Sequence, residues 1–297
     1  LNVNKNLVSI DKISITFDIK TLLADISIGI LENNRIGIVG RNGGGKSTLI
    51  KILAGLIPPD SGKVSRSKKA IFGTLNQFNL VDSKIRVNEY VLGSLKEYEW
   101  AANSEIRQIF SGLFGSDAKE FFNREFDSLS GGEKRRVGIA KLLIEPLNLI
   151  LLDEPTNHLD VEGVAWLSEH IRKRRELAVV VITHDRWFLD EVSDTMWEVV
   201  DGKVEAYEGG YSAYVLAKAE RARQQAAEDA RKNNLIRKEL AWLRRGAPAR
   251  TTKAKARVAS ATALVNTKAE APARQGELGL TKDLGSKRLG SKGVELH

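Results

Sequence analysis

One glycine-rich segment near the N-terminus carries residue types that could bind phosphate groups. Residues 40–48 read Gly-Arg-Asn-Gly-Gly-Gly-Lys-Ser-Thr and match the pattern GxxxxGK followed by Ser or Thr. Glycines let backbone N–H groups wrap phosphate oxygens, a lysine reaches the terminal phosphates, and a serine hydroxyl binds Mg²⁺. An apolar stretch at 35–39 precedes the segment and a helical pattern at 48–53 follows it, as the motif requires. We therefore predict a nucleotide site formed by Gly40, Arg41, Asn42, Gly43, Gly44, Gly45, Lys46, Ser47 and Thr48.

Two consecutive carboxylates follow an apolar run later in the chain. Residues 149–152 are a candidate buried strand, and Asp153 and Glu154 come at its end. In open α/β sheets, ligands bind at the carboxyl ends of the strands. We expect Asp153 to bind Mg²⁺ through water and Glu154 to be the general base that polarises the attacking water. Two acids after a strand could by themselves cap a helix, and it is the phosphate-binding segment that favours hydrolysis.

The first 210 residues alternate strand-like apolar runs with helical patterns, and we expect them to form one nucleotide-binding domain. The alternation predicts an α/β fold with a mostly parallel core sheet. A mixed, partly helical stretch looks like an insertion between the two halves of the sheet, so we expect a helical subdomain at about 80–140. The strand candidates are 7–17, 22–30, 35–39, 149–153, 179–183 and 195–200.

Composition excludes several classes of protein. The chain has 297 residues, 42% of them apolar, with no cysteine and therefore no disulfide or thiolate zinc site. No apolar run approaches the ~20 residues that span a bilayer, and no signal peptide is recognisable. We expect a cytoplasmic protein without membrane insertion. The net charge of +8 is uneven, because residues 217–297 carry 19 Lys and Arg against 8 Asp and Glu.

The basic C-terminal part has helical character. Residues 212–243 lack Gly and Pro and predict one long helix, which residues 244–248 break. A second helical stretch follows, so we expect a helical-hairpin linker at 211–266 with a basic tip, and a flexible tail at 267–297. A solvated, solubilising tail is the alternative to a polyanion-binding one. The residues expected to contact nucleic-acid phosphates are Arg244, Arg245, Arg250, Lys253, Lys255 and Arg257.

Further motifs resemble those of the ATP-binding-cassette (ABC) ATPases. The run 129–133, Leu-Ser-Gly-Gly-Glu, is similar to the family's signature sequence, and 153–160 resembles its second nucleotide motif and D-loop. His184 lies where the switch histidine is expected, Gln77 where the Q-loop glutamine is, and Phe17 where an aromatic stacks on adenine. The resemblance implies an ABC-type P-loop NTPase core with antiparallel β and helical subdomains.

The same resemblance implies roles for these residues in binding and hydrolysing ATP with Mg²⁺. His184 would contact the γ-phosphate, and Gln77 would join the Mg²⁺ ligands and act in catalysis with Glu154. ATP would be closed in by the signature sequence of a partner cassette, and Ser130, Gly131, Gly132 and Glu133 would in turn cover the nucleotide of that partner. A helix N-terminus suits this task because its free N–H groups and dipole attract anions.

Within that family the chain resembles the ABC-F group, and its linker tip resembles Uup-type members. Such proteins carry two cassettes, and residues 267–297 look like the start of a second one, so we expect an N-terminal half. Hydrolysis would then be weak unless the chain dimerises. By resemblance the basic linker would meet the ribosome with its rRNA and tRNA, or branched DNA. The alternatives are the ATPase subunit of an ABC transporter and a truncated, non-hydrolysing nucleotide-binding module.

Overall fold

The computed structural model describes residues 5–17, 20–75, 85–93, 103–115 and 121–244. The chain divides into two compact units, Leu1–Glu220 and Arg221–His297. The elements follow one another in the order β1 (Asn6–Phe17), β2 (Lys20–Leu31), β3 (Arg35–Gly40), α1 (Lys46–Leu53), β4 (Ser61–Arg66), β5 (Phe72–Thr74), α2 (Val87–Leu92), α4 (Ser104–Phe114), the 3₁₀ turn η3 (Phe126–Ser128), α6 (Gly131–Ile144), β6 (Leu149–Asp153), α7 (Val161–Lys173), β7 (Ala178–Ile182), α8 (Arg186–Val192), β8 (Thr195–Val200), β9 (Lys203–Glu208) and α9 (Tyr211–Arg244).

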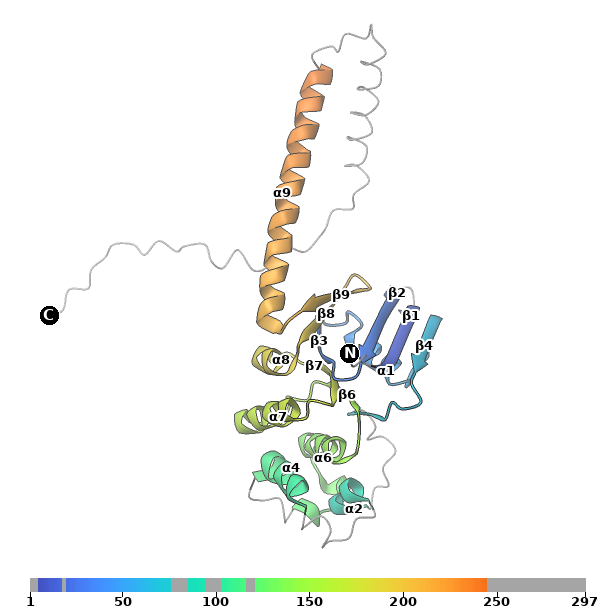
Figure 1. Ribbon diagram of the computed structural model, residues 1–297, viewed down its shortest axis with the longest axis vertical. Helices are drawn as coiled ribbons and strands as arrows, with labels where there is room; N and C mark the ends of the chain where they lie inside the picture. The colour runs from blue at the N-terminus through green and yellow to red at the C-terminus, as the bar shows by residue number, and fades with distance from the viewer. Residues whose placement is uncertain (1–4, 18–19, 76–84, 94–102, 116–120, 245–297) are drawn as a thin grey trace, which may run out of the picture. The chain divides into compact units, whose positions relative to one another are not determined.

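A six-stranded sheet in the order β5-β6-β7-β3-β8-β9 forms the centre of the first unit (Figure 1). Every neighbouring pair is parallel except β8 and β9. The inner strands are apolar on both faces, as parallel strands covered by helices are. β7, for example, reads Ala-Val-Val-Val-Ile and is buried throughout. The predicted α/β fold is confirmed.

A second, antiparallel sheet has the order β2-β1-β4. It packs with α1 on one face of the central sheet, where its apolar residues share a core with alternate residues of the central strands, among them Ile36 and Ile38. The helices α6, α7 and α8 cover the other face, together with α2 and α4. The predicted antiparallel β subdomain is therefore present beside the nucleotide-binding core.

The strand register aligns the ends of three neighbouring strands. Ile182 of β7 lies opposite Ile38 of β3 on one side and opposite Asp153 of β6 on the other. The residues that follow these positions therefore emerge at the same edge of the sheet. That edge brings together the glycine-rich segment, the two carboxylates and His184, which are far apart in sequence.

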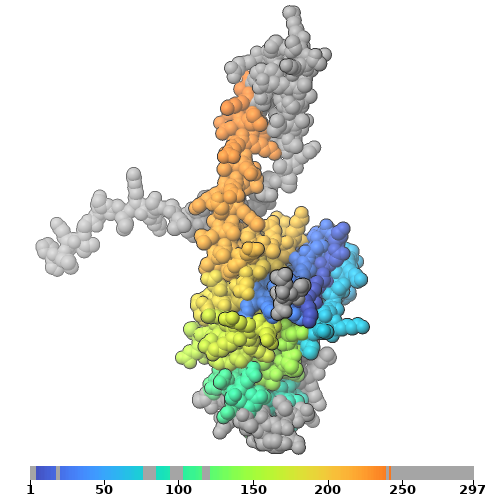
Figure 2. Space-filling model, viewed as in Figure 1, coloured from blue at the N-terminus to red at the C-terminus, as the bar shows by residue number. Residues whose placement is uncertain are grey.

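The helices α2 and α4 lie within the range of about 80–140 that the sequence assigns to a helical subdomain, and α6 begins inside that range and ends at Ile144. α4 packs closely on α7, and in the space-filling view no gap separates them (Figure 2). A Cβ on Gly112 would lie 2.1 Å from the Trp166 ring, which itself stacks on His170 at 4.9 Å between centroids. The close approach of α4 to α7 therefore depends on a glycine at position 112.

The predicted long helix is confirmed as α9, 34 residues from Tyr211 to Arg244. Its first turns belong to the first unit. Asp190 caps its N-terminus by accepting from the Ser212 backbone N–H and hydroxyl at 3.0 and 2.6 Å. The predicted second helix, the tail and the part of the basic tip beyond Arg244 lie outside the described residues. Within the described part of the chain, no helix is both long and apolar enough to cross a membrane.

Candidate nucleotide site

The glycine-rich segment turns sharply between β3 and α1. Gly43 and Gly45 have φ of 71° and 101°, in the left-handed region that favours glycine. A Cβ on Gly40 would lie 2.4 Å from the carbonyl oxygen of Val199, so no side chain fits where the loop leaves β3. Gly45 is the N-cap of α1 and has no side chain to satisfy the first N–H groups of that helix. Those N–H groups, at the positive end of the helix dipole, are suited to bind phosphate oxygens.

The Lys46 side chain lies inside this loop. The residue is 9% exposed, and its Nζ donates to the carbonyl oxygens of Gly40 at 2.9 Å and Arg41 at 3.0 Å. An ammonium group carries three N–H donors, so these bonds leave one for a phosphate oxygen. The loop thus holds a positive charge at its centre.

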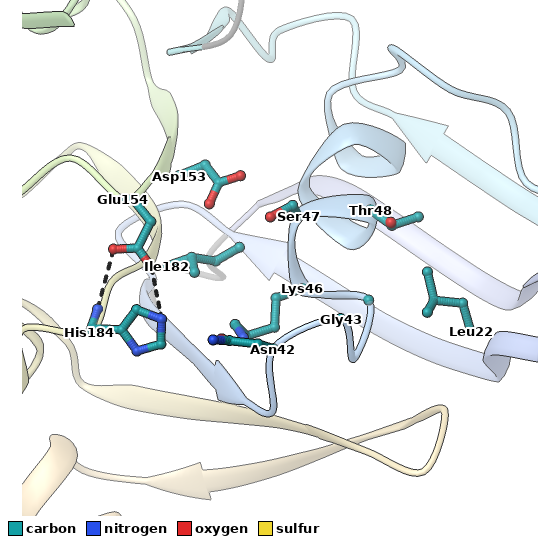
Figure 3. Close-up of a pocket in the computed structure, with 11 residues that line it drawn as sticks. Leu22, Asn42, Gly43, Lys46, Ser47, Thr48, Asp153, Glu154, Ile182 and His184 are labelled. Carbon is teal, nitrogen blue, oxygen red and sulfur yellow. Dashed lines mark hydrogen bonds and ion pairs between the residues drawn. The ribbon is translucent and has the colours of Figure 1, made fainter. Parts of the chain in front are cut away.

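A cavity of about 280 Å³ opens beside the loop. In Figure 3 the hydroxyl of Ser47 points toward the carboxylate of Asp153 across this cavity. Mg²⁺ prefers oxygen ligands such as these hydroxyl and carboxylate groups. In nucleotide sites one or two protein ligands, the phosphate oxygens and water together complete its coordination. The residues present therefore fit a magnesium nucleotide. The cavity is lined by Leu22, Asn42, Gly43, Gly45, Lys46, Ser47, Thr48, Asp153, Glu154, Ile182 and His184.

Glu154 and His184 face each other at the edge of this cavity (Figure 3). Glu154 Oε1 lies 3.5 Å from His184 Nε2, and its Oε2 accepts from the His184 backbone N–H at 3.4 Å. The Glu154 side chain is 19% exposed, whereas that of His184 is 70% exposed. The pair can therefore present an acceptor for a water proton beside an imidazole that is open to a ligand.

The signature run forms the N-terminus of α6. Ser130 is the N-cap: its hydroxyl accepts from the Glu133 N–H at 3.3 Å, and Glu133 Oε2 accepts from the Ser130 N–H at 2.7 Å. Arg124 pairs with Glu133 at 2.8 Å. Burial alone would raise the pKa of Glu133, but the Ser130 hydrogen bonds and Arg124 outweigh it and lower that pKa. A Cβ on Gly131 would meet no atom within 4 Å, so the face of this turn at Gly131 is open.

None of the signature residues lines the cavity that Lys46 and Glu154 share. One family model, described as ABC transporter, matches residues 23–157, and a second with the same description matches 197–277. The chain belongs to the ATP-binding cassette family. ATP hydrolysis is the general activity of cassette domains, and ATP with Mg²⁺ is their usual ligand.

The chain is similar to curated proteins that are about twice as long as it is. It is 36% identical to the Bacillus subtilis protein named Uncharacterized ABC transporter ATP-binding protein YfmR, over 94% of this chain and 49% of the relative. It is 33% identical to the Energy-dependent translational throttle protein EttA of Escherichia coli K12, over 93% of this chain and 55% of the relative. The chain thus spans about half the length of these relatives.

A solved structure shows the same fold. The complex of an archaeal ribosomal stalk protein with the archaeal ribosome recycling factor aABCE1 matches 74% of this chain and 43% of the solved chain. The TM-score is 0.61 at 27% identity. The cassette fold predicted from the motifs is confirmed.

The structure places the remaining predicted residues as follows. Phe17 ends β1 with 54% of its surface exposed and is not among the cavity residues. Leu22 does line the cavity, although it belongs to no sequence motif. Gln77 lies outside the described residues. Arg244 ends α9, with its side chain outside the described part, and the other five basic residues of the linker tip lie wholly outside it. Arg124, the partner of Glu133, had no sequence signal because it belongs to no motif.

Proposed function

We propose that this cassette is an ATPase of the ABC-F type, with ATP hydrolysis driving a conformational switch. The observation that carries the proposal is the cavity that gathers Lys46, Ser47, Asp153, Glu154 and His184 from separate segments. Each of these side chains has a task in cleaving the γ-phosphate from ATP. The further assignment to the Uup type rests on the linker-tip sequence alone.

The proposed mechanism assigns one role to each group. Lys46 and the N–H groups of the loop and of α1 bind the phosphates and offset their charge. Ser47 and Asp153, with Gln77, would hold Mg²⁺, which would supply positive charge to offset that of the transferred phosphoryl group. Glu154 accepts a proton from the attacking water, and His184 donates to the γ-phosphate.

The remaining parts of the nucleotide are assigned to the rest of the loop and to β1. Phe17 stacks on the adenine, and the backbone of the loop with the Thr48 hydroxyl completes the phosphate contacts. The loop residues concerned are Gly40, Arg41, Asn42, Gly43, Gly44 and Gly45.

A second cassette would complete the site. Ser130, Gly131, Gly132 and Glu133 lie outside the cavity of their own chain, which supports contact with nucleotide on a partner. A groove of about 540 Å³ beside His184, lined in part by Val161 and Trp187, gives that partner an apolar surface. Val161 is 86% exposed and Trp187 50%. The partner is either a second half of the protein or another copy of this chain, and turnover is weak without it.

The target of the switch is proposed to be the ribosome. A similar protein is named a translational throttle, and a structural neighbour is titled a ribosome recycling factor. The linker at 211–266 would contact rRNA or tRNA through Arg244, Arg245, Arg250, Lys253, Lys255 and Arg257, or branched DNA through the same charges. Residues 267–297 would begin a second cassette. Such a protein works in the cytoplasm.

The description of the matching family favours a second candidate, the ATPase subunit of an ABC transporter. The two candidates differ in what binds the ATP-loaded form. Co-purification with a membrane permease would support the transporter, and a chain that binds ATP with no turnover at all would be a nucleotide-binding module.

Co-sedimentation with ribosomes tests the proposal. Glu154→Gln should retain ATP, so this variant should pellet with ribosomes in ATP but not in ADP, and branched DNA should not displace it. Displacement by branched DNA would identify DNA as the target. Pelleting that is equal in ATP, in ADP and without nucleotide would contradict a nucleotide-driven switch.

A further inference from the structure

Glu154 has an unusual backbone conformation. Its φ is 52°, in the left-handed region, which residues with a Cβ rarely adopt. Such a conformation is strained and persists only where the surroundings enforce it. The residue comes directly after β6, so its backbone fixes the direction in which the carboxylate enters the cavity.

Both ends of the peptide that joins Asp153 to Glu154 are held. Its N–H, on Glu154, donates to the carbonyl oxygen of Ile182 on β7 at 2.7 Å. Its carbonyl oxygen, on Asp153, accepts from Nη2 of Arg135. The first bond comes from the neighbouring strand, and the second comes from a side chain on α6. Rotation of this peptide would break both bonds.

Arg135 belongs to the signature helix, five residues after Ser130. Its side chain is partly buried and reaches the peptide without lining the cavity itself. Its Nε is buried and has no acceptor among the described residues. A buried N–H without an acceptor costs free energy, and this cost offsets part of what the hydrogen bond from Nη2 contributes to stability.

We infer that Arg135 is the positioning residue of the catalytic base, because it fixes the peptide that aims Glu154 at the attacking water. The inference rests on the proposed role of Glu154 in hydrolysis. It also gives the signature helix a connection to the base of its own cassette. A movement of α6 that shifts Arg135 would turn the Glu154 carboxylate. Contact of Ser130 with a partner would therefore affect hydrolysis in the site of this cassette as well as in the site of the partner.

The test compares Arg135→Ala, Arg135→Lys and Lys134→Ala in the full chain. Lys134→Ala is the matched control, because it also removes one positive charge from α6. The Lys134 ammonium pairs with Asp127 at 3.8 Å and lies over the Phe126 ring at 5.5 Å, and neither residue lines the cavity. Single-turnover hydrolysis with excess protein measures the chemical step, and a fluorescent ATP analogue measures binding. Thermal melting shows whether each variant folds.

We expect Arg135→Ala to bind ATP as the unaltered chain does and to hydrolyse it about ten-fold more slowly, equivalent to about 1.4 kcal/mol in the barrier. Lysine should restore part of the rate, because it keeps one charged donor but lacks the planar fork. Guanidinium ion at non-denaturing concentration should raise the rate of Arg135→Ala and leave Lys134→Ala unchanged. Amide exchange at Glu154 should be faster in Arg135→Ala.

Hydrolysis by Arg135→Ala at the rate of Lys134→Ala would overturn the inference and leave the proposed ATPase intact. If the unaltered chain is no faster than Glu154→Gln, the proposed role of Glu154 fails, and the role of Arg135 fails with it. If Arg135→Ala has a lowered melting temperature, the hydrolysis rates of Arg135→Lys and of Arg135→Ala with added guanidinium test the inference. A folding defect alone would be corrected neither by lysine nor by guanidinium.

Discussion

Replacing Lys218 with methionine tests how the first turns of α9 are joined to the central sheet. Lys218 Nζ pairs with Glu198 Oε1 on β8, and Tyr207 OH donates to the other oxygen of Glu198 at 3.3 Å. The Glu198 side chain is 8% exposed and that of Lys218 is 54% exposed. The substitution therefore removes the countercharge of a carboxylate that water hardly reaches, while keeping most of the apolar side chain.

The size of the effect follows from these exposures. Removing one partner of a fully buried ion pair costs about 3–5 kcal/mol, because the other charge is left uncompensated. Since water reaches Lys218, we expect the smaller loss of about 2 kcal/mol, close to that of a hydrogen bond to a charged group. For a unit of this size that corresponds to a fall in melting temperature of about 4–8 °C.

The reverse substitution should cost less. In Glu198→Gln the freed Lys218 ammonium is hydrated and the amide oxygen still accepts from Tyr207, so we expect a loss of about 1 kcal/mol or less. The double variant should be more stable than Lys218→Met alone, because no buried charge remains. Urea unfolding of the three variants measures these differences. Equal losses in the two single variants, or a double variant that shows their sum, would refute the reasoning.

Three further changes follow from contacts in the helical region. Burial, followed by the charges of neighbouring cations, lowers the pKa of His170, so the folded state resists protonation. The contribution of His170 to the free energy of unfolding should therefore be fully present above the ordinary pKa of 6.5 and decrease as the pH falls below that value. His170→Phe should remove that slope from unfolding curves at pH 5 to 7; an unchanged slope would exclude His170 as its source. Gly112→Ala should destabilise by about 1–3 kcal/mol through its clash with Trp166, despite the better helix propensity of alanine, and a melting temperature above that of the unaltered chain would contradict the tight contact. Gly131→Ala should change the free energy of unfolding by no more than about 0.5 kcal/mol, because its Cβ enters open space. The same substitution should abolish the ATP-dependent dimers that the Glu154→Gln chain forms, as measured by light scattering. Dimers of unchanged affinity would exclude Gly131 from the contact.

The parts of the site that the sequence predicted are those in which neighbouring residues act together. The glycine-rich loop and the two carboxylates after β6 each lie in one short segment, and the residue types in that segment indicate its chemical role. The inner strands β6 and β7 were predictable for a similar reason, because strands buried on both faces are continuously apolar.

The parts that the sequence did not predict depend on which distant segments meet. β4 reads Ser-Gly-Lys-Val-Ser-Arg and β9 reads Lys-Val-Glu-Ala-Tyr-Glu, and both lie at sheet edges where polar residues are tolerated and the apolar pattern is weak. The left-handed backbone of Glu154 has no residue signature, since glutamate is not a residue type that favours it. Arg124 and Arg135 act through the reach of long side chains to a carboxylate and a carbonyl in other segments.

The apolar core that covers one face of the central sheet is continuous from α2 and α4 through α6, α7 and α8 to the first turns of α9. The helices α2 and α4 therefore have no hydrophobic core of their own. Their buried side chains belong to the same core as those of the nucleotide-binding part. A chimera that exchanges residues 85–127 for those of a relative would place a foreign apolar surface against the native faces of α6 and α7. Such an exchange should succeed only when those two faces are exchanged as well, so the natural unit of recombination in this cassette runs to the end of α7.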